Sequence, residues 1–230
     1  MKAIGILGGL GPESTVEYYK GIIRAFRTKK SGNPKIIIYS TNLDEFWKII
    51  EGGRNDELIV WLVEKIESLH DAGADFAVIS SNTPHIAFDE VNSRSPIPLL
   101  SIVEETFKKA KSMDLKKCGL FGTGFTMQSG FYRDYFGKRD ISIVIPDDDD
   151  RQFLDEKISS ELAFGIINDK TRSRFLQIAR KMIDEQSIDS VLLACTELPL
   201  ILSNDREYGI PFLSTTAIHV ESIVKYCLSE

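Results

Sequence analysis

Short apolar runs recur along the chain, and each has the length of a β-strand. They are AIGILG, IIIYS, FAVIS, IPLLS, CGLFG, ISIVI, SVLLAC and IPFLS, at residues 3–8, 36–40, 76–80, 97–101, 118–122, 141–145, 190–195 and 210–214. Because these runs are apolar instead of alternating with polar residues, they are typical of strands that are buried on both faces. Amphipathic segments separate them. This alternation predicts an α/β fold of parallel sheets flanked by helices.

The clearest helical pattern lies at residues 55–75. Its apolar stripe consists of Leu58, Ile59, Leu62, Val63, Ile66 and Leu69. Asparagine favours the N-cap position of a helix, and glycine favours the position just after its C-terminus. We therefore predict a helix with Asn55 as its N-cap that stops at Gly73 and buries this stripe.

The chain also repeats itself at a nearly constant spacing. KAIGILGG at residues 2–9 resembles KKCGLFGT at 116–123, and ADFAVISSNTPH at 74–85 resembles IDSVLLACTELP at 188–199, both 114 residues apart. IPLLS returns as IPFLS after 113 residues. Three matching strands in one register predict duplicated, pseudosymmetric lobes. We expect one lobe to comprise residues 1–99 with a C-terminal helix at 212–230 returning to it, and the other to comprise residues 100–211.

The repeat relates two polar strand ends. With the offset of 114, Cys195 corresponds to Ser81, so each lobe carries one of them just after an apolar strand. In open parallel sheets the carboxyl ends of the strands line the ligand crevice. We therefore expect Ser81 and Cys195 to lie on opposite walls of a cleft between the lobes.

Composition and charge favour a small ligand over a nucleic acid. The chain of 230 residues is 43% hydrophobic and 27% charged, with a formal net charge of −6. Nucleic-acid-binding proteins concentrate Lys and Arg on one face, which this acidic balance argues against. The basic stretch at residues 29–35 is short, and we expect it to be a solvated loop.

Cysteine and histidine usage narrows the compartment and the chemistry. The chain has three cysteines, Cys118, Cys195 and Cys227. An odd number of cysteines without the spacing of a zinc site is typical of reduced thiols. No apolar run reaches the roughly 18 residues of a membrane helix, and the first residues do not resemble a signal peptide. The three histidines are widely spaced. We expect a cytoplasmic protein without a metal site or a membrane partner.

A thiol and a hydroxyl that face each other across a small ligand suit one reaction especially well. One group removes a proton from a tetrahedral carbon, and the other returns a proton to the opposite face. A free thiol has a pKa near 8.5, and the start of a following helix can lower it enough to populate the thiolate of Cys195. A buried, inert thiol is the structural alternative for Cys195. For Ser81 the alternative is a hydroxyl that caps the next helix.

Polar residues follow each of these two positions. Asn82 and Thr83 come after Ser81, and Thr196 and Glu197 come after Cys195. Their side chains, with the backbone N–H groups of the helix starts, could hold the carboxylate and the ammonium of an amino acid. Helix capping is the alternative role for these four residues.

Two turns that follow the first strand of each lobe are further candidates. In GGLGPEST, Gly9-Leu10-Gly11 is similar to a dinucleotide-binding loop, but Ser14 occupies the place of the third glycine. We interpret it as a tight turn whose amides, at Gly9 and Leu10, face a small substrate. Thr123 and Thr126 follow the equivalent turn of the second lobe and are predicted ligand contacts, with turn capping as the alternative.

Four motifs together resemble those of the aspartate/glutamate racemase family. They are GILGGLGPEST at 5–15, SNTPH at 81–85, GTGFTMQSGFY at 122–132 and ACTELP at 194–199, and their order matches over nearly the whole chain. The resemblance implies two pseudosymmetric α/β lobes, no cofactor, a homodimer, and a pair of cysteines that interconvert amino-acid enantiomers.

This chain departs from the pattern of the family at two places. Ser81 stands where the first cysteine is expected, and a hydroxyl is a far weaker acid than a thiol. Members specific for aspartate carry an arginine and a lysine suited to the distal carboxylate. Residues 39–46 and 160–165 hold neither, which favours broader side-chain recognition.

Two other functions fit the same motifs. A single cysteine on this fold also resembles the arylmalonate decarboxylases, in which one thiol protonates the enediolate left by loss of CO2. A ligand-binding protein that kept the cleft and lost catalysis is the other. The amino-acid racemase is the function that the sequence favours.

Overall fold

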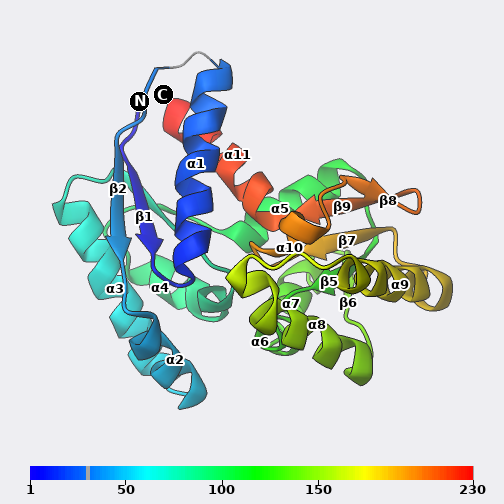
Figure 1. Ribbon diagram of the computed structural model, residues 1–230. Coiled ribbons are helices and arrows are strands. Elements are labelled where there is room, and N and C mark those ends of the chain that lie inside the picture. Colours follow the sequence, from blue (N-terminus) through cyan, green and yellow to red (C-terminus); the bar gives the residue numbers. More distant parts are fainter. Residues whose placement is uncertain (30–31, 230) are drawn as a thin grey trace. The chain divides into compact units, whose positions relative to one another are not determined.

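The computed structural model describes residues 1–29 and 32–229. Lys30 and Ser31, within the basic stretch 29–35, lie outside the described residues, as does Glu230. The chain divides into two compact units, one formed by Met1–Glu105 with His219–Glu230 and the other by Thr106–Ile218. Strands and helices alternate along both units (Figure 1). The predicted α/β class is confirmed.

Unit 1 contains a four-stranded parallel sheet with the order β2-β1-β3-β4. Its strands are β1 Ile4–Gly8, β2 Ile36–Ser40, β3 Phe76–Ile79 and β4 Leu99–Leu100. Its helices are α1 Pro12–Lys29, α2 Leu43–Glu51, α3 Asn55–Asp71, the 3-10 helix η1 Thr83–Ala87 and α4 Phe88–Arg94. The helices α5 Ile102–Ser112 and α11 Thr215–Leu228 each run from one unit into the other.

Unit 2 contains a five-stranded sheet with the order β6-β5-β7-β9-β8. Its strands are β5 Lys117–Phe121, β6 Ser142–Val144, β7 Ser190–Leu193, β8 Arg206–Glu207 and β9 Ile210–Ser214. Its helices are α6 Gly124–Gln128, α7 Phe131–Gly137, α8 Asp148–Ser160, the 3-10 helix η2 Leu162–Phe164, α9 Asp169–Gln186 and α10 Leu198–Ile201. All pairings in it are parallel except that of β8 with β9.

Both faces of the unit 1 sheet are buried, as the apolar strands predict. Along β3, Ala77 and Ile79 pack into a cluster with α2 and α3, whereas Phe76 and Val78 pack into a second cluster with α1 and α11. Successive side chains of a strand point to opposite faces, so two covered faces require an uninterrupted apolar run. The edge strand β2 is only half buried.

Three details differ from the sequence predictions. The helix α3 begins at Asn55 itself, with Arg54 as the N-cap residue, and it ends at Asp71 with Ala72 as the C-cap. Val63 is only half buried, although it still packs against the core. The antiparallel strand β8 was not predicted, because it consists of two residues, Arg206 and Glu207, whose side chains are polar.

The internal repeat is present in the strand registers. The pairs of β1 with β3, from Ile4↔Phe76 to Leu7↔Ile79, correspond to those of β5 with β7, from Cys118↔Ser190 to Phe121↔Leu193, at the offset of 114. An aspartate fixes the start of each pairing. The Asp75 carboxylate accepts a hydrogen bond from the amide of Ala3 at 2.6 Å, and Asp189 accepts one from that of Lys117 at 3.1 Å. The same backbone geometry has been built twice.

Two buried histidines hold the turn between β4 and α5 in unit 1. His219 Nε2 lies 3.1 Å from the carbonyl oxygen of Leu100, so this nitrogen carries the proton, and Nδ1 accepts from the Tyr18 hydroxyl at 2.8 Å. His85 Nε2 accepts from the amide of Ile102 at 3.3 Å. Burial lowers the pKa of each imidazole to about 3, so both rings are neutral near neutral pH.

Because the pKa values of these two histidines are low, we predict that unit 1 loses stability in weak acid. An unfolded imidazole has a pKa near 6.5, so between about pH 6.5 and pH 3 the unfolded chain binds more protons than the folded one. The free energy of unfolding should therefore fall as the pH is lowered through this window, by at most about 1.4 kcal/mol per pH unit for each histidine. Urea titrations followed by tryptophan fluorescence measure this in unit 1, because Trp47 and Trp61 both lie there.

A His85→Gln variant is the matched control, because glutamine can donate and accept the same hydrogen bonds but does not titrate. Its stability should fall about half as steeply with decreasing pH as that of the wild type. An equal slope in the two proteins would show that His85 does not carry the effect.

Candidate active site

The turn from β1 into α1 is fixed by contacts within unit 1. Gly9 has a φ of 79°, and a Cβ atom there would lie 2.5 Å from backbone atoms of Thr41. The Gly9 amide donates to Thr15 Oγ1 at 2.9 Å, so this amide is engaged within unit 1. Leu10 is buried and packs into the core around α3. Contact of Gly9 and Leu10 with a substrate stays a prediction.

Hydrogen bonds from several elements hold the carboxyl end of β3. The buried Ser80 amide donates to the Leu7 carbonyl at 3.0 Å, and the Ser14 hydroxyl of α1 contacts the Ser80 carbonyl at 2.5 Å. The next residue, Ser81, is partly exposed, and its carbonyl accepts from His85 Nδ1 at 3.0 Å. His85 therefore fixes the backbone of Ser81 from a ring whose tautomer is set by Ile102.

The Ser81 side chain does not act as a helix cap. Asn82 is the N-cap residue of η1, and its side chain makes no capping hydrogen bond. The Ser81 hydroxyl makes no hydrogen bond within the described part of the chain. Asn82 and Thr83 are buried, with 5% and 7% of their surfaces exposed. The capping alternatives for Ser81 and Asn82 are therefore wrong.

In unit 2 the turn after β5 has the capping geometry that was left open as an alternative. Thr123 is the N-cap residue of α6, and its Oγ1 accepts from the amide of Thr126 at 3.3 Å. The same hydroxyl donates to Thr126 Oγ1 at 3.1 Å, and Thr126 is buried. The amide of Gly124 donates to the Asp155 carboxylate of α8 at 2.7 Å. Ligand contact by Thr123 and Thr126 stays a prediction beside this structural role.

Cys195 occupies the position in unit 2 that Ser81 occupies in unit 1. The residue before it, Ala194, donates its amide to the Phe121 carbonyl at 2.7 Å, as Ser80 does to Leu7. Cys195 is partly exposed and packs against the core of unit 2. Its thiol donates to Glu197 Oε2 at 2.8 Å, and the Thr196 hydroxyl donates to the same oxygen, also at 2.8 Å. One carboxylate oxygen therefore receives two side-chain donors.

The protonation state of Cys195 is opposite to the one predicted. Burial, followed by the charge of Glu197 and its hydrogen bond to the thiol, raises the pKa of Cys195 well above its usual range. The amides of Thr196 and Glu197 favour the thiolate, as predicted, but they are outweighed. The helix that follows, α10, has only four residues and therefore contributes little dipole. The resting site holds a neutral thiol beside a carboxylate.

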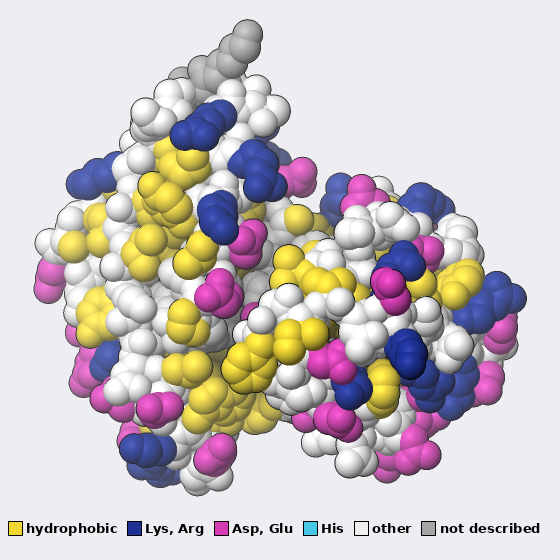
Figure 2. Space-filling model, viewed as in Figure 1, with side chains coloured by type: hydrophobic (Ala, Val, Ile, Leu, Met, Phe, Trp, Pro, Cys, Tyr) yellow, Lys and Arg dark blue, Asp and Glu magenta, His cyan; other side chains and the backbone are white. Residues whose placement is uncertain are grey.

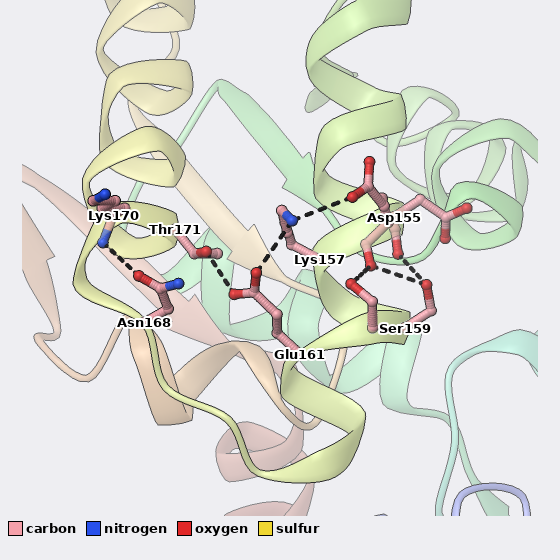
Figure 3. Close-up of polar contacts among 9 residues, drawn as sticks. Asp155, Lys157, Ser159, Glu161, Asn168, Lys170 and Thr171 are labelled. Atoms are coloured by element: carbon pink, nitrogen blue, oxygen red, sulfur yellow. Dashed lines mark hydrogen bonds and ion pairs between the residues drawn. The ribbon is translucent and has the colours of Figure 1, made fainter.

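The stretch 160–165, where a lysine for a distal carboxylate would be expected, instead contains the end of α8 and the 3-10 helix η2. Glu161 accepts from the Thr171 hydroxyl at 2.6 Å and lies 3.1 Å from Lys157 Nζ (Figure 3). These contacts lower the pKa of Glu161, the hydrogen bond from Thr171 contributing most. Leu162 enters the core, whereas 76% of Phe164 is exposed. No basic side chain within 160–165 is available for an acidic substrate.

Arg54 follows the other stretch, 39–46, in the sequence, and its side chain makes local contacts instead of offering a cation to a distal carboxylate. Its guanidinium contacts Glu57 at 2.6 Å and the Lys48 carbonyl at 2.8 Å. Within 39–46, the Asn42 side chain caps α2, and Thr41 binds the Gly8 carbonyl at 2.9 Å. Both stretches therefore have local structural roles.

Two broader properties concern the described residues as a whole. Residues 1–29 and 32–229 contain no cluster of three or more His, Cys, Asp or Glu side chains placed to hold a metal ion. Every helix in that part of the chain is too short or too polar to cross a membrane. On the face seen in Figure 2, basic and acidic side chains are interspersed over both units.

Comparisons with known proteins agree with the motifs. A family model described as Asp/Glu/hydantoin racemase matches residues 7–223. The broad specificity amino-acid racemase RacX of Bacillus subtilis (strain 168) is 27% identical over 235 residues, which cover 98% of each chain. A crystal structure from Yersinia pestis, of a protein assigned to the Asp/Glu racemases, is 33% identical over 100% of both chains, with a TM-score of 0.92. That of an aspartate racemase homologue from Pyrococcus horikoshii OT3 is also 33% identical over 100% of both chains, with a TM-score of 0.85.

These matches confirm the resemblance that the four motifs indicate. They extend over both units and include the strand ends that carry Ser81 and Cys195. The amino-acid racemases among these relatives are isomerases, and the chain is an enzyme of the same kind. It belongs to the Asp/Glu/hydantoin racemase family.

Proposed function

We propose that the chain is a cofactor-independent amino-acid racemase that interconverts L- and D-aspartate, with glutamate or a broader range of amino acids as further substrates. The observation that carries the proposal is the equivalence of Ser81 and Cys195. They follow β3 and β7 in matching registers, and each sits at the carboxyl edge of a parallel sheet. This edge is where open α/β sheets bind ligands.

The proposed chemistry uses one of these groups on each face of the Cα atom. The Cys195 thiolate takes the Cα proton, which breaks the C–H bond and leaves its electron pair in a carbanion delocalised into the carboxylate. The Ser81 hydroxyl, or a water molecule held by it, then donates a proton to the opposite face. Solvent returns both groups to their starting states. The reverse sequence converts the other enantiomer.

The polar residues beside each group are proposed to hold the common part of the substrate. Asn82 and Thr83, with the amides that begin η1, suit a carboxylate. Glu197 is a carboxylate beside Cys195 and suits the ammonium group, while Thr196 orients it through its hydroxyl. These contacts would bind the carboxylate and the ammonium group that all amino acids share.

Broad recognition of the side chain is the finer part of the proposal. Neither 39–46 nor 160–165 supplies a free cation for a distal carboxylate. A relative of similar length, RacX, is described as having broad specificity. We therefore expect aspartate to be one of several substrates.

A decarboxylase is the second candidate, because a thiol that is neutral at rest is ready to donate a proton. In this reading Cys195 would protonate an enediolate after CO2 leaves a disubstituted malonate. Release of CO2 from such a malonate, without exchange on any amino acid, would favour it.

Compartment and assembly belong to the same proposal. The three thiols are unpaired with one another, as in a reducing compartment, and we propose a cytoplasmic enzyme. We also propose a homodimer. Val16 and Tyr19 of α1 and Ile38 of β2 are more than two-fifths exposed, and Figure 2 shows hydrophobic side chains gathered over this part of unit 1. Sedimentation equilibrium tests the dimer.

Incubation of L- and D-amino acids in D2O is the direct test of the racemase. One enantiomer should exchange its Cα proton faster than it inverts, because a thiol can return a solvent deuteron to the face from which it removed the proton. Aspartate, glutamate and a panel of neutral amino acids are followed by proton NMR for exchange and by chiral chromatography for inversion.

Measurable binding without exchange or inversion for any amino acid would contradict the racemase and favour a ligand-binding protein. Cys195→Ala is the control and should abolish exchange. Because two enantiomers have equal free energy, kcat/KM must be equal in the two directions, and this equality checks the assay.

Replacement of Ser81 by cysteine tests the second group. The thiol is a much stronger acid than the hydroxyl, so inversion should accelerate by about tenfold or more. Ser81→Ala should reduce inversion while exchange at the Cys195 face persists. An unchanged inversion rate in Ser81→Cys, with an unchanged circular dichroism spectrum, would remove Ser81 from the mechanism.

A further inference from the structure

Glu197 contacts the reactive sulfur directly, and its geometry assigns it more than a binding role. Its Oε2 atom lies 2.8 Å from Cys195 Sγ and 2.8 Å from Thr196 Oγ1. A carboxylate oxygen that accepts both donors stabilises the thiol in its protonated form. The contact that marks this site therefore keeps the thiol inactive as a base.

We propose that Glu197 is a substrate-sensing catalytic residue, which holds Cys195 as a thiol in the free enzyme and releases it as a thiolate when an ammonium group binds the carboxylate. This inference rests on the proposed racemase function. It concerns how the same site becomes active.

The two oxygens of Glu197 allow both roles at once. Oε2 receives the two side-chain donors, whereas Oε1 accepts no hydrogen bond from any residue that the structure describes. Glu197 is also partly exposed, so a ligand can reach it. An ammonium group at Oε1 would neutralise the charge that faces the sulfur without displacing Thr196.

The proton balance of this step is simple. Free enzyme carries a thiol and a carboxylate. When the zwitterionic amino acid binds, its ammonium pairs with the carboxylate, the S–H bond breaks, and water carries that proton to bulk solvent. The site then holds the thiolate, the carboxylate and the ammonium, and the thiolate is free to take the Cα proton. One proton is released for each amino acid bound.

The Coulombic repulsion between the Glu197 carboxylate and a Cys195 thiolate is strong at this distance, because the effective dielectric constant of a protein site is well below that of water. Neutralising the carboxylate removes this repulsion from the thiolate. Among the described residues, Glu197 is the side chain whose charge raises the pKa of Cys195.

The first experiment needs no substrate. In Glu197→Gln, which removes the charge, alkylation of Cys195 by iodoacetamide near pH 8 should be about tenfold faster than in the wild type, since each unit of thiol pKa changes the thiolate fraction tenfold. Inversion should nevertheless slow, mainly through a higher KM, because the ammonium contact is lost. A merely structural residue would not raise reactivity and lower catalysis together.

Three control variants bracket this result. Glu197→Asp keeps the charge and should react at a rate close to that of the wild type. Asp184→Asn removes an exposed carboxylate of the same unit that contacts Arg180, and it should leave alkylation unchanged. Cys195→Ala gives the background from Cys118 and Cys227, which are fully buried.

The second experiment uses ligands, and its main comparison, between aspartate and succinate, needs only the wild-type protein. L-aspartate, bound to the wild type near pH 8 with a pH indicator, should release close to one proton per site. Succinate, which is aspartate without its ammonium group, should release none, and aspartate should release none from Glu197→Gln.

The outcomes separate this inference from the racemase proposal. Equal alkylation rates in wild type and Glu197→Gln, or equal proton release by aspartate and succinate, would overturn the sensing role even if exchange in D2O is observed. Absence of exchange with every amino acid would instead remove the racemase, whatever the alkylation rates show.

Discussion

Parallel pairing of β1 with β3, and of β5 with β7, is the constraint on which the rest of the structure depends. Parallel strands have their carboxyl ends on the same side of the sheet, and each connection must cross back to the opposite side before the next strand begins. The residues just after β3 and β7 therefore lie at the carboxyl ends of their sheets. Because both pairings share a register, Ser81 and Cys195 are placed by the same backbone hydrogen bonds, from Ser80 to Leu7 and from Ala194 to Phe121.

Within this shared frame the two strand ends differ in electrostatics. Ser81 is positioned by His85, a ring that is neutral because it is buried, and no carboxylate of residues 1–29 or 32–229 contacts the serine hydroxyl. Cys195 is positioned beside Glu197, whose equivalent in unit 1 is Thr83. The duplicated backbone fixes where the two groups lie, and a few side chains decide which of them can carry a negative charge.

Most of the fold could be predicted from the sequence because its signals are strong and local. The central apolar strands are buried on both faces, and the pairings of β1 with β3 and of β5 with β7 repeat exactly at the offset of 114, so α/β class and repeat follow directly from the pattern. The edge strand β8 and the cap of α3 were missed. A two-residue polar strand has no pattern, and Asn55 and Arg54 are adjacent, so only backbone geometry can choose between them.

The protonation state of Cys195 could not be predicted for a different reason. The sequence shows that a helix and a glutamate both follow the cysteine, and the two have opposite effects on a thiol. Which effect is larger depends on the length of α10 and on the rotamer that turns Glu197 back toward the sulfur. The hydrogen bond from the Ile102 amide to His85 likewise joins residues whose spacing in sequence carries no signal, whereas the one from His85 to the Ser81 carbonyl spans a single helical turn.

A neutral resting thiol bears on the difference between Ser81 and Cys195, the two groups proposed for opposite faces of the substrate Cα atom. Since both enantiomers have the same free energy, no arrangement of Ser81 and Cys195 can favour one product at equilibrium. The difference between the hydroxyl and the thiol can affect only the reaction rates and the protonation states of the two groups. A site in which the stronger base is formed only beside a bound cation would also limit the exposure of a thiolate to oxidants and metals between turnovers. The Glu197 carboxylate, which disfavours a Cys195 thiolate in the free enzyme, would then be compatible with catalysis. The ammonium group of the bound amino acid would neutralise its charge.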